Sequence, residues 1–353
     1  MEYRGRYRIF DSSRIATYPI STRINKVRSG QLILPGGLPP EAPEVPVRLG
    51  AAIGQLAKAV HQARAANRPV ILFTGGHLIK NGMGPLLADL VERGLITLVA
   101  GTLATAIHDF ELALIGETSE YVPRALEEGR FGMAYEFAYL NTAMLLGDRQ
   151  QLGLGESLGR AICDRAFLKE ILDIAGPESA PRAFAHPEFS VLAACYRCGV
   201  PMTIHAGIGT DVSDQHPSFD GAAKGGTSGR DFLIYANEVE QLHRGGVVIN
   251  IGSAVTGPEV FLKAASMAGN VGSSPRNLIT ADFDLRPFRR NRMTDESTAG
   301  YYFRDQKSIV VRVPEAYRGR GHYIKGDMKK TFLLLYRKLL GIQPAVRHAD
   351  PSH

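Results

Sequence analysis

The polar loop between residues 204 and 220 holds the densest set of chemically capable side chains in this sequence. Its imidazole and carboxylate groups are His205, Asp211, Asp214, His216 and Asp220. Imidazole and carboxylate together suit zinc, iron or manganese, but their spacing matches no compact metal motif. Three interpretations stay open: a metal site, a contact to substrate or cofactor, and a polar loop closed by an Asp turn. We take His205, Asp211 and His216 as catalytic candidates and assign no metal ligand.

Glycine and threonine follow several short apolar runs. The run at 70–73 is followed by Thr74-Gly75-Gly76, and the run at 95–100 by Gly101-Thr102, with His108-Asp109 early in the helix expected next. Glycine lets a ligand approach the backbone closely, and helix N-termini offer free N–H groups to phosphate. Neither a Gly-x-Gly-x-x-Gly after the first strand nor a Walker loop is present. We therefore expect a nucleotide site of unusual sequence.

These segments need a scaffold that brings strand ends together. Short apolar runs alternate with amphipathic helical stretches, which predicts an α/β fold: a Rossmann-like parallel sheet with helices on both faces. Ligands of such sheets bind at the carboxyl ends of the strands. The segment 224–229 reads as a mobile glycine-rich loop. The expected strands are 70–73, 95–100, 202–204, 247–251, 278–281 and 308–313.

The chain divides into unequal parts. We expect an N-terminal arm over residues 1–48, which packs on the body or on a neighbouring subunit. One α/β domain follows over 49–341, with a helical insertion at about 117–200, and 342–353 form a flexible tail.

Composition limits the class of protein. The 353 residues are 44% hydrophobic and 22% charged, as in an ordinary globular chain. No apolar window is long enough for a membrane helix, and the charged N-terminus lacks a signal core, so we expect a cytoplasmic protein. The net charge of +6 is modest, and nucleic acid is not an expected partner. Three cysteines argue against a disulfide framework.

The segment from Val70 to Val122 resembles the nucleotide-binding core of deoxyhypusine synthase. A weaker resemblance continues in the same order and covers about two-thirds of the chain. The residues that carry it are Phe73-Thr74-Gly75-Gly76, the helix from Gly82, Leu98-Val99-Ala100-Gly101-Thr102, His108-Asp109, Gly209-Thr210-Asp211, Arg244-Gly245-Gly246-Val247-Val248 and Thr280-Ala281-Asp282-Phe283-Asp284.

This resemblance implies an NAD-binding transferase, usually a homotetramer with active sites between subunits. The family oxidises spermidine and passes its aminobutyl group through an enzyme lysine to a lysine of a translation factor, or in some relatives to a small amine. The resemblance places Asp211 at a family acid and Asn250 where the family has a histidine. The cofactor contacts it implies are Thr74, Gly75, Gly76, Gly101, Thr102, His108, Asp109, Gly245, Gly246, Thr280, Ala281 and Asp284.

The sequence departs from the family at its catalytic centre. The family lysine follows Trp-Gly, but this chain has no tryptophan, and residues 298–304 contain no lysine. Lys307 lies nearby without that context. Without the amine there is no Schiff-base carrier, so we expect an NAD enzyme acting on a polyamine or another amine, by aminoalkyl transfer or dehydrogenation, and not a true deoxyhypusine synthase. The alternatives are a metal-dependent hydrolase built on the His205–His216 loop and a non-catalytic nucleotide-binding protein.

Overall fold

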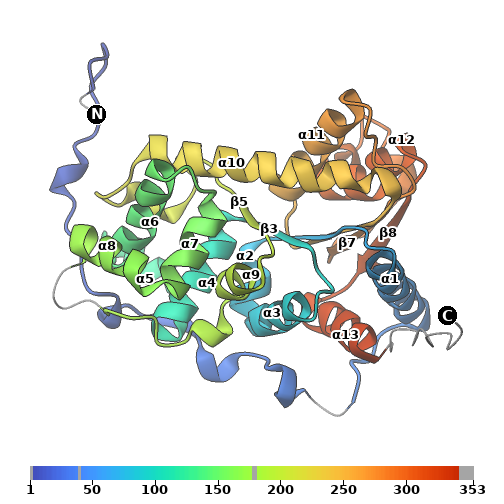
Figure 1. The fold of residues 1–353 in the computed structure, drawn as a ribbon, viewed down its shortest axis with the longest axis horizontal. Coiled ribbons are helices and arrows are strands. Elements are labelled where there is room, and N and C mark those ends of the chain that lie inside the picture. Colours follow the sequence, from blue (N-terminus) through green and yellow to red (C-terminus); the bar gives the residue numbers. More distant parts are fainter. Residues whose placement is uncertain (1–2, 39–40, 177–180, 342–353) are drawn as a thin grey trace, which may run out of the picture.

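The computed structural model describes residues 3–38, 41–176 and 181–341. The tail expected at 342–353 lies outside the described residues. Figure 1 shows a sheet between two helical layers, with an N-terminal segment that projects away from the body.

The central sheet has six parallel strands. They are β2 (Val70–Thr74), β3 (Leu98–Thr102), β5 (Met202–His205), β6 (Val247–Ile251), β7 (Ile279–Asp284) and β8 (Arg320–Lys325), arranged β5-β3-β2-β6-β7-β8. Counted along the chain, this is the order 3-2-1-4-5-6 of the Rossmann fold. The expected fold class is therefore confirmed.

Helices cover both faces because alternate side chains of each central strand point to opposite sides. In β2, Val70 and Leu72 pack into one core, and Ile71 and Phe73 pack into the other. Strands buried on both faces read as continuous apolar runs. The first face carries α1 (Val47–Ala65), α3 (Gly84–Glu92), α4 (Leu103–Ile115) and α13 (Met328–Gly341), and the second carries α10 (Gly221–Glu240) and α11 (Thr256–Asn270).

The segment expected as a helical insertion begins with a strand. This strand, β4 (Glu117–Glu120), pairs antiparallel with β1 (Asn25–Arg28) of the N-terminal arm. The arm is therefore fixed to the body at β1. Helices follow β4: α5 (Val122–Glu127), α6 (Phe137–Arg149), α7 (Leu154–Cys163), α8 (Arg165–Ala175) and α9 (Val191–Cys198).

Two expected elements are wrong. The apolar run 308–313, expected as a strand, is helical: η11 (Gln306–Arg312) is a π-helix that continues into α12 (Val313–Ala316). A short apolar run cannot distinguish a buried strand from a buried helix. The expected loop 224–229 lies inside α10, which begins where the Asp220 carboxylate accepts hydrogen bonds from the N–H groups of Ala222 and Ala223. None of the described helices has the length and apolar content needed to cross a membrane.

Candidate functional site

The order of the strands reverses between β2 and β6, and their C-terminal turns meet there. The Gly75 N–H donates to the Ile251 carbonyl at 3.1 Å, and a Cβ on Gly75 would lie 2.3 Å from the Gly252 oxygen. Gly252 has φ +68°, which favours glycine. Beyond it, the Ser253 hydroxyl accepts from the Gly257 N–H at 2.9 Å at the start of α11. In doubly wound sheets a dinucleotide crosses this reversal.

The other glycines at this edge pack against α4. A Cβ on Gly76 would lie 2.9 Å from His108 Cδ2, and one on Gly101 would lie 2.9 Å from Thr105 Cβ. The Thr74 side chain is fully buried and donates to the Gly75 carbonyl. Close packing against α4 therefore already explains why Gly76 and Gly101 are glycines. Because the Thr74 side chain is buried, only the backbone of this turn is available at the C-terminal ends of the strands.

His108 and Asp109 are neighbours in the sequence but face different surroundings. His108 is partly exposed at the turn after β2, with Nδ1 2.8 Å from the Thr118 hydroxyl. Asp109 is buried, and it accepts hydrogen bonds from Ser190 Oγ and from the Val191 and Leu192 N–H groups at the start of α9. Burial raises the Asp109 pKa to about 6. Asp109 thus holds α9 in place and does not reach the strand ends.

A cavity of about 480 Å³ opens at the ends of β3 and β5, beneath the N-terminal halves of α10 and α11. Thr102, His205, Phe232 and Thr256 are among the residues that line it. The His205 ring stacks on Phe73, and its Nε2 lies 3.1 Å from the Thr203 hydroxyl. Burial lowers the His205 pKa to about 3. The imidazole is therefore uncharged at neutral pH.

The Asp211 carboxylate is occupied by a buried lysine. Lys224 is fully buried, and its Nζ donates to Asp211 at 2.9 Å, to Asp214 at 2.5 Å and to the Gly207 carbonyl at 2.9 Å. Burial raises the pKa of Asp211 against the lowering effect of Lys224. Both carboxylates therefore already share an internal cation before any substrate arrives.

The His216 ring bonds Ser218. Its Nδ1 accepts from the Ser218 N–H at 3.2 Å and lies 2.7 Å from the Ser218 hydroxyl, which itself accepts from Asn141. Burial lowers the His216 pKa to about 4. Among the described residues, one group of three side chains is close enough to hold a metal ion, and it consists of Asp282, Asp284 and Asp305. None of these belongs to the 204–220 loop. The hydrolase alternative therefore gains no support from the geometry.

That acidic group lies at the end of β7, beyond the reversal. Asn250 and Asp282 are register neighbours, and Asn250 Nδ2 donates to Asp282 at 2.8 Å. Asp284 and Asp305 both bond the Arg286 guanidinium. Burial, with the nearby Asp305, raises the pKa of Asp282 well above its ordinary value. This cluster brings Asn250, Asp282 and Asp284, which the sequence analysis named, together with Asp305, which it did not.

Four residues expected at the cofactor lie elsewhere. Gly245 and Gly246 precede β6, beside Arg68 and Pro69, at the opposite edge of the sheet from the strand ends. Their place there corrects the expectation, because they cannot share a site with Gly75. Thr280 and Ala281 are fully buried inside β7, where Thr280 donates to the Ile309 carbonyl.

Comparison with known proteins leaves the family open. No protein-family model and no curated protein matches the sequence. Solved structures that are similar include the arginine dihydrolase ArgZ from cyanobacteria, with 16% identity, TM-score 0.46 and 83% of this chain covered. AgrE bound to ornithine and NAD⁺ has 15% identity, TM-score 0.46 and 84% covered. A protein described as a deoxyhypusine synthase, from Entamoeba histolytica, has 10% identity, TM-score 0.46 and 84% covered.

These structures differ in length from this chain. The alignment spans 32% of ArgZ and 34% of AgrE, about a third of each, and 90% of the Entamoeba protein. The TM-scores lie below 0.5, and the fold class therefore rests on the strand order itself.

Proposed function

We propose that this chain binds NAD across the C-terminal edge of its sheet and acts as an enzyme on an amine. The observation that carries the NAD part is the 3-2-1-4-5-6 strand order with glycine turns meeting at the reversal. The amine part rests on the resemblance to the deoxyhypusine synthase family.

The chain's own groups fit a dinucleotide at this edge. The turns at Gly75 and Gly252 would lie beside the dinucleotide at the reversal, and the cavity lined by Thr102 and His205 lies next to the reversal on the first half of the sheet. NAD, when bound, would supply a hydride acceptor. Uncharged His205 would line the cavity without repelling a cationic substrate.

The second half of the sheet would take the amine. Asp284 and Asp305 share a single guanidinium, from Arg286, and the Asp282 carboxyl beside them offers a further hydrogen-bonding group where an amine could bind. Asp211, in contrast, is held by Lys224. We therefore move the amine contact from Asp211 to the end of β7.

Dehydrogenation fits the chain better than transfer through a lysine. Lys307 is buried, with Nζ 3.4 Å from the centre of the Tyr301 ring. Burial and nearby arginines lower the Lys307 pKa, but Tyr301 covers the amine. We propose that the amine first loses its ammonium proton to water and then transfers a hydride from its α-carbon to NAD⁺. The products would be NADH and an iminium ion, which water would hydrolyse to a carbonyl compound and a released amine or ammonia.

Calorimetric titration with NAD, after removal of any co-purified nucleotide, tests the binding site. We expect a dissociation constant in the micromolar range, about 8 kcal/mol of binding free energy. Polyamines and diamines would then be screened by the absorbance of NADH. The absence of NAD binding would contradict the proposal as a whole. NAD binding without turnover of any amine would favour the non-catalytic alternative.

A further inference from the structure

A buried chain of hydrogen bonds links the N-terminal arm to the turn after β2. Arg23 of the arm donates to Glu111 Oε1 at 2.6 Å. The Thr118 hydroxyl donates to Glu111 Oε2 at 2.5 Å, and His108 Nδ1 lies 2.8 Å from the same hydroxyl. Arg23, Glu111 and Thr118 are each at most 8% exposed, so water does not compete for these bonds.

The direction of each bond follows from the charge on Glu111. Burial opposes the ionisation of Glu111, but the charge of Arg23 and the hydrogen bonds from Arg23 and Thr118 lower the Glu111 pKa. An ionised carboxylate only accepts hydrogen bonds, and a threonine hydroxyl has one proton to give. The Thr118 hydroxyl therefore donates its hydrogen bond to Glu111 and accepts a hydrogen bond from His108. The proton of His108 then lies on Nδ1, and Nε2 keeps its lone pair.

The Nε2 side of the His108 ring lies beside the turn after β2, where we propose that the cofactor binds. A Cβ on Gly76 would lie 2.9 Å from Cδ2, the ring carbon next to Nε2. No hydrogen bond to Nε2 exists within the described part of the chain, and Nε2 is not among the buried unpaired atoms there. Burial lowers the pKa of His108, with a further contribution from Lys80. An uncharged imidazole nitrogen with a free lone pair accepts a hydrogen bond from a ligand hydroxyl or N–H group, but it offers no proton to the oxygens of a phosphate.

We propose that Arg23, Glu111 and Thr118 are positioning residues that fix His108 as the Nδ1–H tautomer, so that Nε2 accepts a hydrogen bond from a ligand hydroxyl at the turn after β2. For a dinucleotide this hydroxyl belongs to a ribose. The ligand part of this inference rests on the proposed NAD function, and the tautomer part does not.

Substitution Glu111→Gln gives the sharpest test because glutamine has nearly the same shape as glutamate but can reverse the direction of the hydrogen bonds from Thr118 to Glu111 and from His108 to Thr118. The side-chain amide introduced by this substitution would donate to Thr118, whose hydroxyl would then donate to His108 Nδ1 and leave the proton on Nε2. Two-dimensional ¹⁵N NMR of the full-length protein distinguishes the two imidazole tautomers. We expect Nδ1–H in the original protein and Nε2–H in E111Q, with His108→Gln used to assign the signal.

The protein contains its own reference histidine. His61 Nε2 lies 2.8 Å from the Leu339 carbonyl, which can only accept, so His61 must carry its proton on Nε2 in both proteins. Thr118→Val is the second variant, because it removes the link and should leave His108 as a mixture of tautomers. An Nε2–H signal for His108 in the original protein would overturn the proposal, even if E111Q fails to fold.

Binding experiments then separate the two parts of the inference. If NAD binds, E111Q should weaken it about tenfold, while its folded NMR spectrum is retained. An unchanged NAD affinity with a reversed tautomer would refute the hydroxyl contact alone. Failure of the original protein to bind NAD would refute the proposed function and leave the tautomer result standing.

Discussion

At the scale of single residues, buried charges are held by partners far away in the sequence. Asp231 in α10 is 1% exposed, and one of its oxygens accepts from the N–H groups of Gly155 at 2.9 Å and Ile204 at 2.6 Å. The other oxygen has no partner within the described chain. Burial raises the pKa of Asp231 from 3.8 to about 7, so the folded state holds a proton there that the unfolded state has lost.

This shift makes stability depend on pH in a predictable direction. Between the unfolded and folded pKa values the folded state binds more protons, so the contribution of Asp231 to stability declines as pH rises from about 4 to 7. Asp231→Asn keeps the accepting oxygen and cannot ionise. Relative to this variant, the original protein should lose about 2–3 kcal/mol of unfolding free energy between about pH 5 and pH 8, measured by urea denaturation.

The matched control is Asp295→Asn, because Asp295 is exposed in the loop before η10 (Ala299–Tyr302). Its unfolding free energy should stay within about 0.5 kcal/mol of the original protein at each pH. A constant difference between Asp231→Asn and the original protein across the pH range would show that Asp231 remains ionised in the fold.

At the scale of elements, the contact between the turns after β2 and β6 should control both folding and ligand binding. Gly75→Ala would place a Cβ 2.3 Å from the Gly252 carbonyl oxygen, which forces the two turns apart. We expect at least a tenfold loss of NAD affinity and about 1–3 kcal/mol lower unfolding free energy, measured by calorimetry and denaturation.

Gly50→Ala in α1 is the control for this substitution. The nearest atom to its new Cβ is Val45 Cγ2, at 3.6 Å, and alanine is the better helix former by up to about 1 kcal/mol. We expect unchanged NAD affinity and equal or higher stability. An equal loss of NAD affinity in both variants would show that the turns are not the binding site.

The elements that the sequence predicts well are those whose pattern is local. β2 and β6 are apolar runs bounded by turns, and the sequence predicts their positions closely. For β3 the expected strand at 95–100 begins three residues before Leu98 and ends two before Thr102. β8 (RGHYIK) is an edge strand with a largely polar sequence, and it gave no such signal. The apolar run at 308–313 was assigned to a strand in its place. Likewise the partner of Asp211 could not be foreseen, because the glycines beside Lys224 indicated a loop and not a helix.

At the scale of the whole molecule, the strand order is the property that carries the functional proposal, and it lies beyond local patterns. Alternating strands and helices indicate a parallel sheet, but the reversal between β2 and β6 follows from which face each connecting helix takes. The placement of Gly245 and Gly246 at the far edge follows from the same topology. The order of motifs along the sequence therefore could not show that Gly245 and Gly246 lie at the N-terminal ends of the strands, whereas Gly75 lies at the C-terminal ends.

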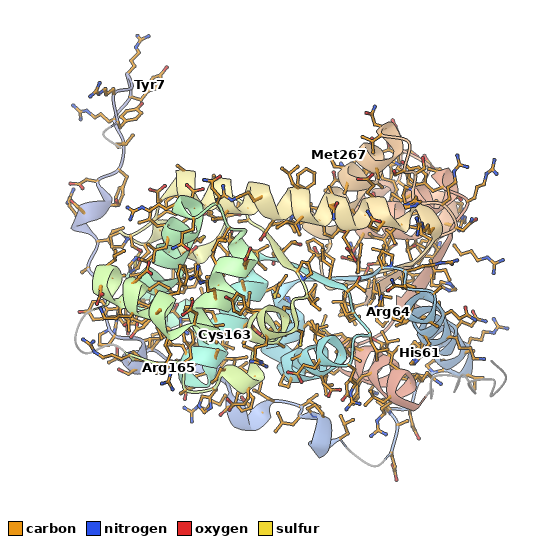
Figure 2. The ribbon with its side chains drawn as sticks, viewed as in Figure 1. Tyr7, His61, Arg64, Cys163, Arg165 and Met267 are labelled. Atoms are coloured by element: carbon orange, nitrogen blue, oxygen red, sulfur yellow. The ribbon has the colours of Figure 1, made fainter. Side chains whose placement is uncertain are left out.

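The first part of the N-terminal arm, residues 3–14, leaves large apolar side chains uncovered. Tyr7 is 76% exposed and Phe10 is 77% exposed, and the hydrogen bonds seen for residues 3–14 reach no further than Ile15. Figure 2 shows Tyr7 on the projecting segment, well away from the body. Apolar side chains gathered on such a segment usually mark a contact with another molecule.

If this segment packs on a neighbouring subunit, as we propose, its removal should lower the mass of the assembly without destabilising the fold. A chain that begins at Ile15 should sediment as a smaller species than the original protein, with an unfolding free energy within about 0.5 kcal/mol. Phe10→Ser should give a weaker effect in the same direction. Leu233→Ser is the control, since Leu233 is 60% exposed on α10. If all four proteins have the same number of subunits across a range of concentrations, the arm has no role in assembly, because its removal then costs no contact between subunits.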